Sequence, residues 1–315
     1  MRAVVTGGAG FFGSHLVDAL LEQGIEVVVL DNFSTGRLEN LPFPHARLKL
    51  VEGSICSEDS LDKALSGGAD VLYHLAANAS VVRSIQNPEE TLESNLKGSL
   101  ATFLAAKRHR VEKVIFASSA AVYGVPEQIP LREGMAATPI SPYGIEKLMG
   151  EHYLRYFSES AGFQGAAIRF FNIYGPRQDA SSPYSGVISK FCGSAIAGEE
   201  LRVFGDGSQT RDFLYVKDAC SLLVKLAQEK WAGYWVANGG TGRETSLNQL
   251  TQAISRSANR DIYRTHHEAR AGDIRHSVAD VSFLASRFGW AAQTSLDEGI
   301  CHLLASMSLP VASRA

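Results

Sequence analysis

The stretch Thr6-Gly7-Gly8-Ala9-Gly10-Phe11-Phe12-Gly13 decides the fold of the first part of the chain. It follows Arg2-Ala3-Val4-Val5, which predicts a buried strand, and it precedes residues 12–23, whose apolar spacing predicts a helix. Gly7 permits a tight turn, Gly10 lets the backbone approach a diphosphate, and Gly13 lets the helix pack close to the strand. The first amides of the helix then face the phosphates, so the turn predicts a dinucleotide site.

Asp31 supports the prediction of a dinucleotide site. A glycine turn alone is weaker support, because it also occurs as an ordinary strand-to-helix connection. Asp31 follows a second apolar run, Ile25–Leu30, at the spacing expected for the acid that binds the adenosine ribose hydroxyls. A carboxylate at this place repels a 2′-phosphate. We therefore expect NAD in preference to NADP.

Strand-like and helical segments alternate along the first half, which predicts an α/β fold with a doubly wound parallel sheet. Further strands are expected at residues 47–52, 70–76, 111–118 and 165–171, and further helices at 58–65, 88–108 and 144–160. After Asn172 the rhythm breaks into loops rich in glycine and proline, which indicates a second, smaller lobe. The apolar run Phe213–Val216 and the helix after it are expected to return to the sheet. The expected division is a Rossmann domain of residues 1–172 and about 212–237, an interleaved substrate-binding lobe of about 173–211 and 238–308, and a flexible tail at 309–315.

The composition is typical of a chain that buries a large core, with 315 residues of which 45% are hydrophobic and 20% charged. The formal net charge of −3 argues against a nucleic-acid-binding surface. Cys56, Cys192, Cys220 and Cys301 have no metal or redox spacing, so we expect buried free thiols and no metal site. No apolar run reaches the roughly 20 residues of a membrane span, and the first strand starts close to Met1, so a soluble, cytoplasmic protein is expected.

Ser119, Tyr143 and Lys147 are the candidate catalytic residues. Tyr143 opens a helix and Lys147 lies four positions later, so both side chains project from one face. Tyrosine is a poor base at neutral pH, but an adjacent ammonium and a positive nicotinamide ring both favour the phenolate and are expected to lower its pKa. Lys147 would also hold the nicotinamide ribose, while Ser119, at a strand end, can hydrogen-bond the reacting sugar oxygen.

Together these segments resemble the extended short-chain dehydrogenase/reductase superfamily, in its branch of NAD-dependent nucleotide-sugar epimerases and dehydratases. The resemblance runs from Met1 to about residue 305 and implies NAD as cofactor and a nucleotide sugar as substrate. The residues that it assigns to the cofactor are Gly7, Gly10, Phe11, Phe12, Gly13, Asp31, Asn32, Ser34, Thr35, Gly36, Ser54, Ile55, Leu75, Ala76, Ala77, Asn95, Tyr143, Lys147 and Phe170. Those that it assigns to the sugar nucleotide are Ser119, Asn172, Arg211, Arg270, Asp273 and Ser277. The arginines suit this role because a diphosphate in a chain of net negative charge needs guanidinium donors.

Ala120 and Ala121 distinguish members of this branch. In the 4,6-dehydratases the sequence at this strand end resembles Ser-Thr-Asp-Glu-Val-Tyr-Gly. In the UDP-glucuronate decarboxylases a glutamate occupies the place of Ala121. With alanine at both positions, elimination lacks its general acid and base. The pattern Ser-Ser-Ala-Ala-Val-Tyr-Gly instead resembles the UDP-hexose 4-epimerases.

The expected activity is therefore the interconversion of UDP-glucose and UDP-galactose through a transient 4-keto sugar. The segment Gly272–Asp280 resembles epimerases that accept N-acetylated sugars, where a small residue at Ser277 leaves room at sugar carbon 2. UDP-N-acetylglucosamine and UDP-N-acetylgalactosamine are expected substrates too.

Three alternatives remain open, namely a uronate epimerase, a dehydratase that takes its acid from elsewhere, and a non-catalytic dinucleotide-binding regulator. The intact Ser119, Tyr143 and Lys147 argue against the regulator. The resemblance also implies a homodimer built through a four-helix bundle of residues 88–108 and 144–160. In the first of these segments Leu92, Leu96, Leu100, Phe103 and Leu104 are more apolar positions than one buried face requires.

Overall fold

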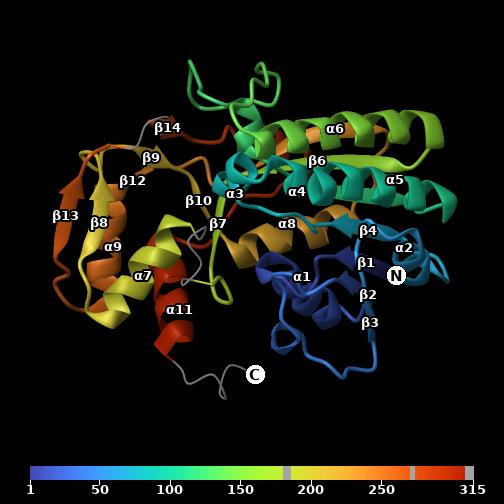
Figure 1. Ribbon diagram of the computed structural model, residues 1–315, viewed down its shortest axis with the longest axis horizontal. Coiled ribbons are helices and arrows are strands. Elements are labelled where there is room, and N and C mark those ends of the chain that lie inside the picture. The colour runs from blue at the N-terminus through green and yellow to red at the C-terminus, as the bar shows by residue number, and fades with distance from the viewer. Residues whose placement is uncertain (180–185, 270–273, 309–315) are drawn as a thin grey trace. The chain divides into compact units, whose positions relative to one another are not determined.

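The computed structural model describes residues 1–179, 186–269 and 274–308 (Figure 1). The chain forms two compact units. The first consists of Met1–Gly124, Ala136–Phe170 and Cys220–Ala237, and the second of Val125–Met135, Phe171–Ala219 and Asn238–Ala315. Relative to the lobes expected from the sequence, the second unit also takes Val125–Met135 and continues to Ala219.

A seven-stranded sheet in the order β11-β6-β5-β4-β1-β2-β3 forms the centre of the first unit, and the expectation of a doubly wound α/β fold is confirmed. Its strands are β1 (Arg2–Thr6), β2 (Glu26–Asp31), β3 (Leu48–Glu52), β4 (Val71–His74), β5 (Lys113–Ser119), β6 (Gln164–Phe170) and β11 (Tyr234–Gly239). The pairs that join β3 to β6 through the middle of the sheet are parallel. The middle strands are continuous apolar runs because helices cover both of their faces.

The order of the strands reverses at β1. The chain runs outward from β1 through β2 to β3, and then returns to the other side of β1 with β4, β5 and β6. Connections after β1 and β4 therefore leave the sheet in opposite directions. Open α/β sheets bind their ligands at the carboxyl ends of the strands where the order reverses, which here are β1 and β4.

Helices cover both faces of this sheet, with α1 on one face and the adjacent α5 and α6 on the other (Figure 1). The helical elements of this part are α1 (Phe11–Glu22), a 3-10 turn (Leu38–Asn40), α2 (Glu58–Leu65), α3 (Val81–Gln86), α4 (Pro88–Thr91), a π-helix (Leu92–Lys97), α5 (Gly98–Arg108), a 3-10 helix (Ala120–Tyr123), α6 (Pro142–Ala161) and α8 (Val216–Gln228). Leu72, Phe103, Phe116 and Leu154 belong to the core between the sheet and α5 and α6. This packing fixes the strand ends that carry the candidate site.

Residues 88–108 are helical as expected, although Leu92–Lys97 within them forms a π-helix between α4 and α5. Two other expectations are wrong. Phe213–Val216 does not return to the parallel sheet, since β10 (Phe213–Tyr215) pairs with β7 (Asn172–Tyr174), and β11 is the strand that joins the sheet. Of the four free cysteines, Cys56 and Cys301 are exposed, because they lie on outward-facing surfaces of the fold.

Over its described residues, the second unit contains three small sheets and four helices that lie wholly within it. Besides β7 and β10, its strands are β8 (Leu201–Phe204), β9 (Thr210–Arg211), β12 (Thr245–Ser246), β13 (Arg264–His267) and β14 (His276–Ser277). Its helices are α7 (Val187–Ala197), α9 (Leu247–Ala258), α10 (Ser282–Phe288) and α11 (Leu296–Ser308), of which α7, α9 and α11 pack together (Figure 1). Among residues 1–179, 186–269 and 274–308, no helix has the length and apolarity needed to cross a membrane.

Candidate active site

The glycine turn lies at the carboxyl end of β1 and leads into α1. Gly7 has a φ of +72°, and a Cβ built on Gly13 would lie 2.0 Å from the carbonyl oxygen of Gly7. A larger residue at either position is therefore excluded by backbone atoms that have no room to move. Gly10 caps α1 with no side-chain hydrogen bond, so the first amides of the helix remain available to an anion. This backbone cradle fits the diphosphate of a dinucleotide.

Asp31, at the end of β2, holds the same turn from the next strand. Its Oδ2 accepts a hydrogen bond from the Ala9 amide at 2.9 Å, and its Oδ1 accepts one from the Phe33 amide at 2.8 Å. A carboxylate has about four lone-pair positions, so each oxygen retains capacity for a ribose hydroxyl. A Cβ at Gly36 would lie 2.9 Å from Oδ1, which explains why the loop returns to Asp31 with a glycine. The loop residues Asn32, Ser34 and Thr35 are exposed around this carboxylate.

The remaining residues assigned to the cofactor follow neighbouring strands of the sheet. Leu75, Ala76 and Ala77 come directly after β4, and Ser54 and Ile55 follow β3. Phe170 ends β6, and its ring meets the ring of Phe12 edge-on at 5.1 Å between centroids. Ile55 is buried and lies so close to Gly98 that a Cβ there would approach its Cδ1 to 2.5 Å, which makes it a packing residue of the strand end.

His74 connects the glycine turn to Asn95, which is buried in the π-helix. His74 Nδ1 lies 2.8 Å from Thr6 Oγ1, and its Nε2 lies 2.9 Å from Ser99 Oγ. The Ser99 hydroxyl donates to the Asn95 carbonyl, so its oxygen is free to accept from Nε2. Burial lowers the pKa of His74 to about 3, with a further contribution from Lys147, so the imidazole is neutral.

The fold brings the three candidate catalytic residues together. Ser119 ends β5, and the hydroxyl of Ser141 caps α6 by accepting from the Gly144 amide at 3.2 Å. This cap sets the first turn of α6, where the Tyr143 side chain hydrogen-bonds Ser119. The Lys147 ammonium donates to the Ala117 carbonyl at 2.8 Å and lies 5.8 Å from the centroid of the Tyr143 ring.

The electrostatics differ from the expectation for Tyr143. The protein's own groups raise the pKa of Tyr143, because burial outweighs the hydrogen bond from Ser119, and Glu146 adds to the rise. The expectation that the Lys147 ammonium lowers the pKa of Tyr143 is therefore wrong when only the groups of this chain are considered. Burial also lowers the pKa of Lys147 to about 8, against the opposing charges of Glu146 and Glu151.

A buried ion pair beneath this site was missed by sequence reasoning. Arg169 in β6 donates to both carboxylate oxygens of Glu151 in α6, with Nε to Oε1 at 2.9 Å and Nη2 to Oε2 at 2.7 Å. Ser118, next to Ser119, also donates to Glu151, and the guanidinium lies 4.8 Å from the centre of the Tyr123 ring. The pair therefore ties the end of β5 to α6. An acid four residues after Lys147, on the same helix face, was the available signal.

Of the residues assigned to the sugar nucleotide, Asn172, Arg211 and Ser277 lie in the second unit. Arg211 in β9 and Ser277 in β14 are direct partners in a parallel pair. Asn172 is exposed at the start of β7, and its side-chain amide donates to the Asp212 carbonyl at 3.0 Å. Arg270, Asp273 and the expected tail at 309–315 lie outside the described residues.

Asp212 is the organising residue that sequence reasoning did not assign. It is fully buried and accepts from the Thr241 amide at 2.8 Å, the Thr241 hydroxyl at 2.7 Å, the Gly242 amide at 2.9 Å and the Ala279 amide at 3.2 Å. Burial raises its pKa despite these bonds. Asp212 thus fixes the loops that flank Arg211 and Ser277. Its signal was an acid directly before the apolar run Phe213–Tyr215.

Comparison with known proteins adds the family. The sequence profile of the NAD dependent epimerase/dehydratase family matches residues 3–235. The chain belongs to this family. NAD is the cofactor of the family, and the glycine cradle and Asp31 fit it. In such a site, bound NAD would serve as a temporary acceptor of a hydride.

Similar proteins of this family include sugar-nucleotide epimerases and a decarboxylase. A UDP-N-acetylglucosamine 4-epimerase from Methanobrevibacter ruminantium M1, solved in complex with UDP-N-acetylmuramic acid, is 39% identical, with a TM-score of 0.92 and 97% of each chain covered. A UDP-glucose 4-epimerase of Mycolicibacterium smegmatis is 38% identical over 95% of this chain and 96% of its own length. UDP-glucuronic acid decarboxylase 1 of Arabidopsis thaliana is 34% identical over 95% of this chain and 68% of its own length. The chain is thus an enzyme of the NAD-dependent epimerase/dehydratase family that acts on nucleotide sugars.

Proposed function

We propose that this enzyme is a UDP-hexose 4-epimerase that interconverts UDP-glucose and UDP-galactose, and also UDP-N-acetylglucosamine and UDP-N-acetylgalactosamine. The observation that carries the proposal is the strand end of β5. Ser119 there hydrogen-bonds Tyr143, while Ala120 and Ala121, which follow it in the 3-10 helix, provide no acid or base. An epimerisation with no net redox change needs the serine and the tyrosine, and it needs no acid or base at residues 120 and 121.

In this proposal Tyr143, as phenolate, takes the proton of the sugar 4-hydroxyl while carbon 4 is oxidised. Ser119 holds the reacting oxygen by a hydrogen bond, and the ammonium of Lys147 binds the nicotinamide ribose, whose positively charged ring would favour the phenolate. The 4-keto sugar turns over, and Tyr143 returns the proton to the oxygen after reduction from the opposite face. The nucleotide must be held firmly and the sugar loosely for this rotation, which fits binding contacts remote from carbon 4.

The second unit supplies the proposed sugar-nucleotide contacts. Arg211 would bind the diphosphate through its guanidinium, and Asn172 would add a hydrogen bond. Ser277, beside Arg211, would leave space for an acetamido group at sugar carbon 2. Arg270 and Asp273 complete the proposed contacts.

Decarboxylation is the second candidate, because the Arabidopsis relative carries that name. Against it stands Ala121, where the decarboxylase pattern has a glutamate. The test is to incubate the purified protein with NAD and each of five substrates, namely the four UDP-hexoses and UDP-glucuronate, and to separate the products by chromatography. Epimerised hexoses that vanish with Tyr143→Phe support the proposal. A pentose nucleotide formed from UDP-glucuronate, with unchanged hexoses, contradicts it.

We further propose that two copies associate through α5 and α6. Leu92 and Leu104 are 43% and 40% exposed, whereas Phe103 between them is fully buried, so this segment has an apolar face outside the core. Ile145, Met149 and Tyr156 make a matching exposed row on α6 at helical spacing. Two such helix pairs would bury these rows in a four-helix bundle.

A further inference from the structure

The first turn of α6 has one backbone donor that its own cap does not satisfy. The N–H groups at the start of a helix have no partner within it and need acceptors from elsewhere. Pro142, the first residue of α6, has no N–H. The Gly144 amide donates to the Ser141 hydroxyl at 3.2 Å, and the Ile145 amide donates to the Ser141 carbonyl at 3.0 Å. The remaining donor of this turn is the amide of Tyr143.

Ser84, in α3, supplies the acceptor for this amide. The Ser84 side chain is fully buried, and its Oγ accepts from the Tyr143 amide at 3.1 Å. The same hydroxyl donates to the Val81 carbonyl at 2.7 Å, one turn earlier in α3. The direction of both bonds is fixed, because an amide N–H can only donate and a carbonyl can only accept. The hydroxyl of Ser84 therefore connects a carbonyl of α3 to an amide of α6.

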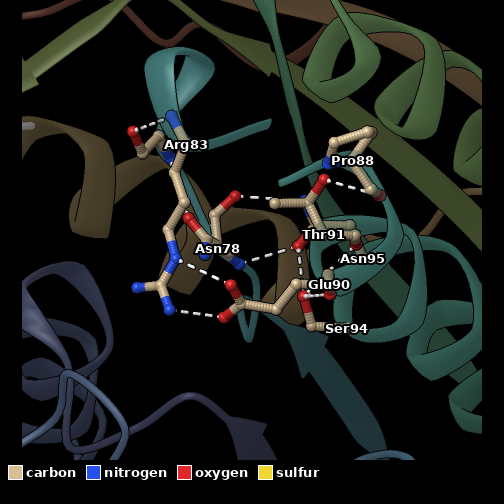
Figure 2. Close-up of polar contacts among 8 residues, drawn as sticks. Asn78, Arg83, Pro88, Glu90, Thr91, Ser94 and Asn95 are labelled. Carbon is tan, nitrogen blue, oxygen red and sulfur yellow. Dashed lines mark hydrogen bonds and ion pairs between the residues drawn. The ribbon is translucent and has the colours of Figure 1, made fainter. Parts of the chain in front are cut away.

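Other contacts hold α3 in place independently of the Ser84 hydroxyl. The Ser80 side chain caps α3 by accepting from the Arg83 amide at 2.9 Å. The guanidinium of Arg83 forms an ion pair with Glu90 in α4, with Nε to Oε2 at 3.1 Å (Figure 2). Removal of the Ser84 hydroxyl should therefore leave α3 in position and affect the start of α6.

The loop before α3 is continuous with residues assigned to the cofactor. Leu75–Ala77 follow β4, and the next residue, Asn78, is bound through both of its backbone groups by the side chain of Asn95 (Figure 2). The Asn78 amide donates to Asn95 Oδ1 at 2.7 Å, and Asn95 Nδ2 donates to the Asn78 carbonyl at 3.0 Å. The bond from Ser84 thus connects the segment after β4 to the first turn of α6.

Tyr143 is consequently held at two points by different elements. Its side chain hydrogen-bonds Ser119 at the end of β5, while its backbone amide is bound by Ser84. A general acid or base must lie within hydrogen-bond reach of the proton that it moves. A displacement of about 1 Å can cost about a hundredfold in rate. The position of the Tyr143 backbone therefore bears directly on turnover.

We propose that Ser84 is a positioning residue that fixes the backbone of Tyr143, and through it the position of the phenol relative to Ser119 and the substrate. The inference rests on the proposed function, because the phenol moves a proton in that reaction. It predicts that the Ser84 hydroxyl affects turnover through Tyr143.

The decisive variant is Ser84→Ala, which removes one oxygen and adds no bulk. The Tyr143 amide then lacks its buried acceptor, so the first turn of α6 has to shift to satisfy it. Ser158→Ala is the matched control. It also removes a buried serine hydroxyl that donates to a backbone carbonyl, that of Phe163 at 2.7 Å, but it does so at the opposite end of α6.

Hydrogen exchange of the Tyr143 amide tests the contact without substrate. The exchange rate is measured by NMR on protein labelled with ¹⁵N-tyrosine, in which Tyr143→Phe identifies the signal. We expect this amide to exchange on the order of tenfold faster in Ser84→Ala, because its hydrogen bond is lost, and at the wild-type rate in Ser158→Ala. An unchanged rate in Ser84→Ala would overturn the inference.

A double-mutant cycle tests whether the effect on turnover passes through Tyr143. We measure kcat and KM for UDP-glucose in the wild type, Ser84→Ala, Tyr143→Phe and the double variant. Ser84→Ala should lower kcat about tenfold with KM nearly unchanged, and should have no further effect when Tyr143 is already phenylalanine.

The same proportional loss of kcat in both backgrounds would overturn the inference and leave Ser84 a structural role. An equal loss of kcat in Ser158→Ala would do the same. If the wild type does not epimerise a UDP-hexose, the proposed function fails, while the exchange rate still decides whether Ser84 binds the Tyr143 backbone.

Discussion

The Glu151–Arg169 ion pair provides the sharpest test of how the site is held in place. We consider Glu151→Gln, which keeps the volume of the side chain and removes its charge. Arg169 then remains charged, because guanidinium does not lose its proton in proteins, and its side chain is only 7% exposed. The glutamine oxygen can accept from Arg169 or from Ser118, but it cannot replace both charged hydrogen bonds of the bidentate pair.

The expected loss follows from this uncompensated charge. Removing one partner of a buried ion pair costs about 3–5 kcal/mol of the free energy of unfolding. A 3% exposed carboxylate and a bidentate geometry place Glu151 in this class. Glu159→Gln is the matched control, since it removes the partner of Arg155 on the same helix where the two side chains are 60% and 62% exposed. The control should leave stability nearly unchanged.

Urea denaturation followed by tryptophan fluorescence measures the free energy of unfolding of both variants. The comparison is valid if the dependence of this free energy on urea concentration is the same in both. The double variant Glu151→Gln/Arg169→Met should be more stable than Glu151→Gln alone, because it removes the stranded charge. The reasoning is refuted if Glu151→Gln is as stable as the Glu159→Gln control. It is also refuted if the double variant loses as much free energy of unfolding as the single variants Glu151→Gln and Arg169→Met lose together.

Four further predictions concern function and assembly. Tyr143→Phe should lower kcat by about a hundredfold or more while NAD affinity in calorimetry is retained, because a general acid/base contributes that much; near wild-type turnover would remove Tyr143 from the reaction. Gly13→Ala should abolish NAD binding in the same assay, since its Cβ would lie 2.0 Å from a backbone oxygen, and normal affinity would contradict the cradle. Ser277→Tyr should lose activity on UDP-N-acetylglucosamine and keep much of that on UDP-glucose, as measured by product chromatography; equal losses would count against a role at carbon 2. Light scattering at micromolar concentration should give the mass of a dimer, and Leu104→Glu should give a monomer, whereas a wild-type monomer would disprove the association.

Local sequence signals were sufficient where chemistry and geometry act within a few residues. The glycine turn predicted β1 and α1 because a tight turn and a close helix approach depend on the absence of a Cβ at particular positions. Asp31 was recognisable for the same reason, since it ends the next strand. Residues 58–65 were predicted as a helix and form α2 with those bounds, because its cap and its amphipathic pattern are both local.

Errors occurred where partners distant in sequence decide the structure. The wide turn at Leu92–Lys97 was not predicted, because its hydrogen-bond spacing differs from that of an α-helix while its residues do not. Phe213–Val216 was assigned to the main sheet because an apolar run does not encode which strand it will pair with. The choice of β7 for β10, and of β11 for the sheet edge, is made by packing of the whole chain.

The sequence by itself determined the α/β sheet, the NAD cradle and the identity of Ser119, Tyr143 and Lys147 as candidate reactive groups, since these depend on residue type and short spacing. Only the tertiary structure decided the electrostatic state of that site. It buried Lys147 and Tyr143 and compensated Glu151 with Arg169. The pKa of a side chain depends on burial and on charges brought near it by folding, and neither is written in the local sequence.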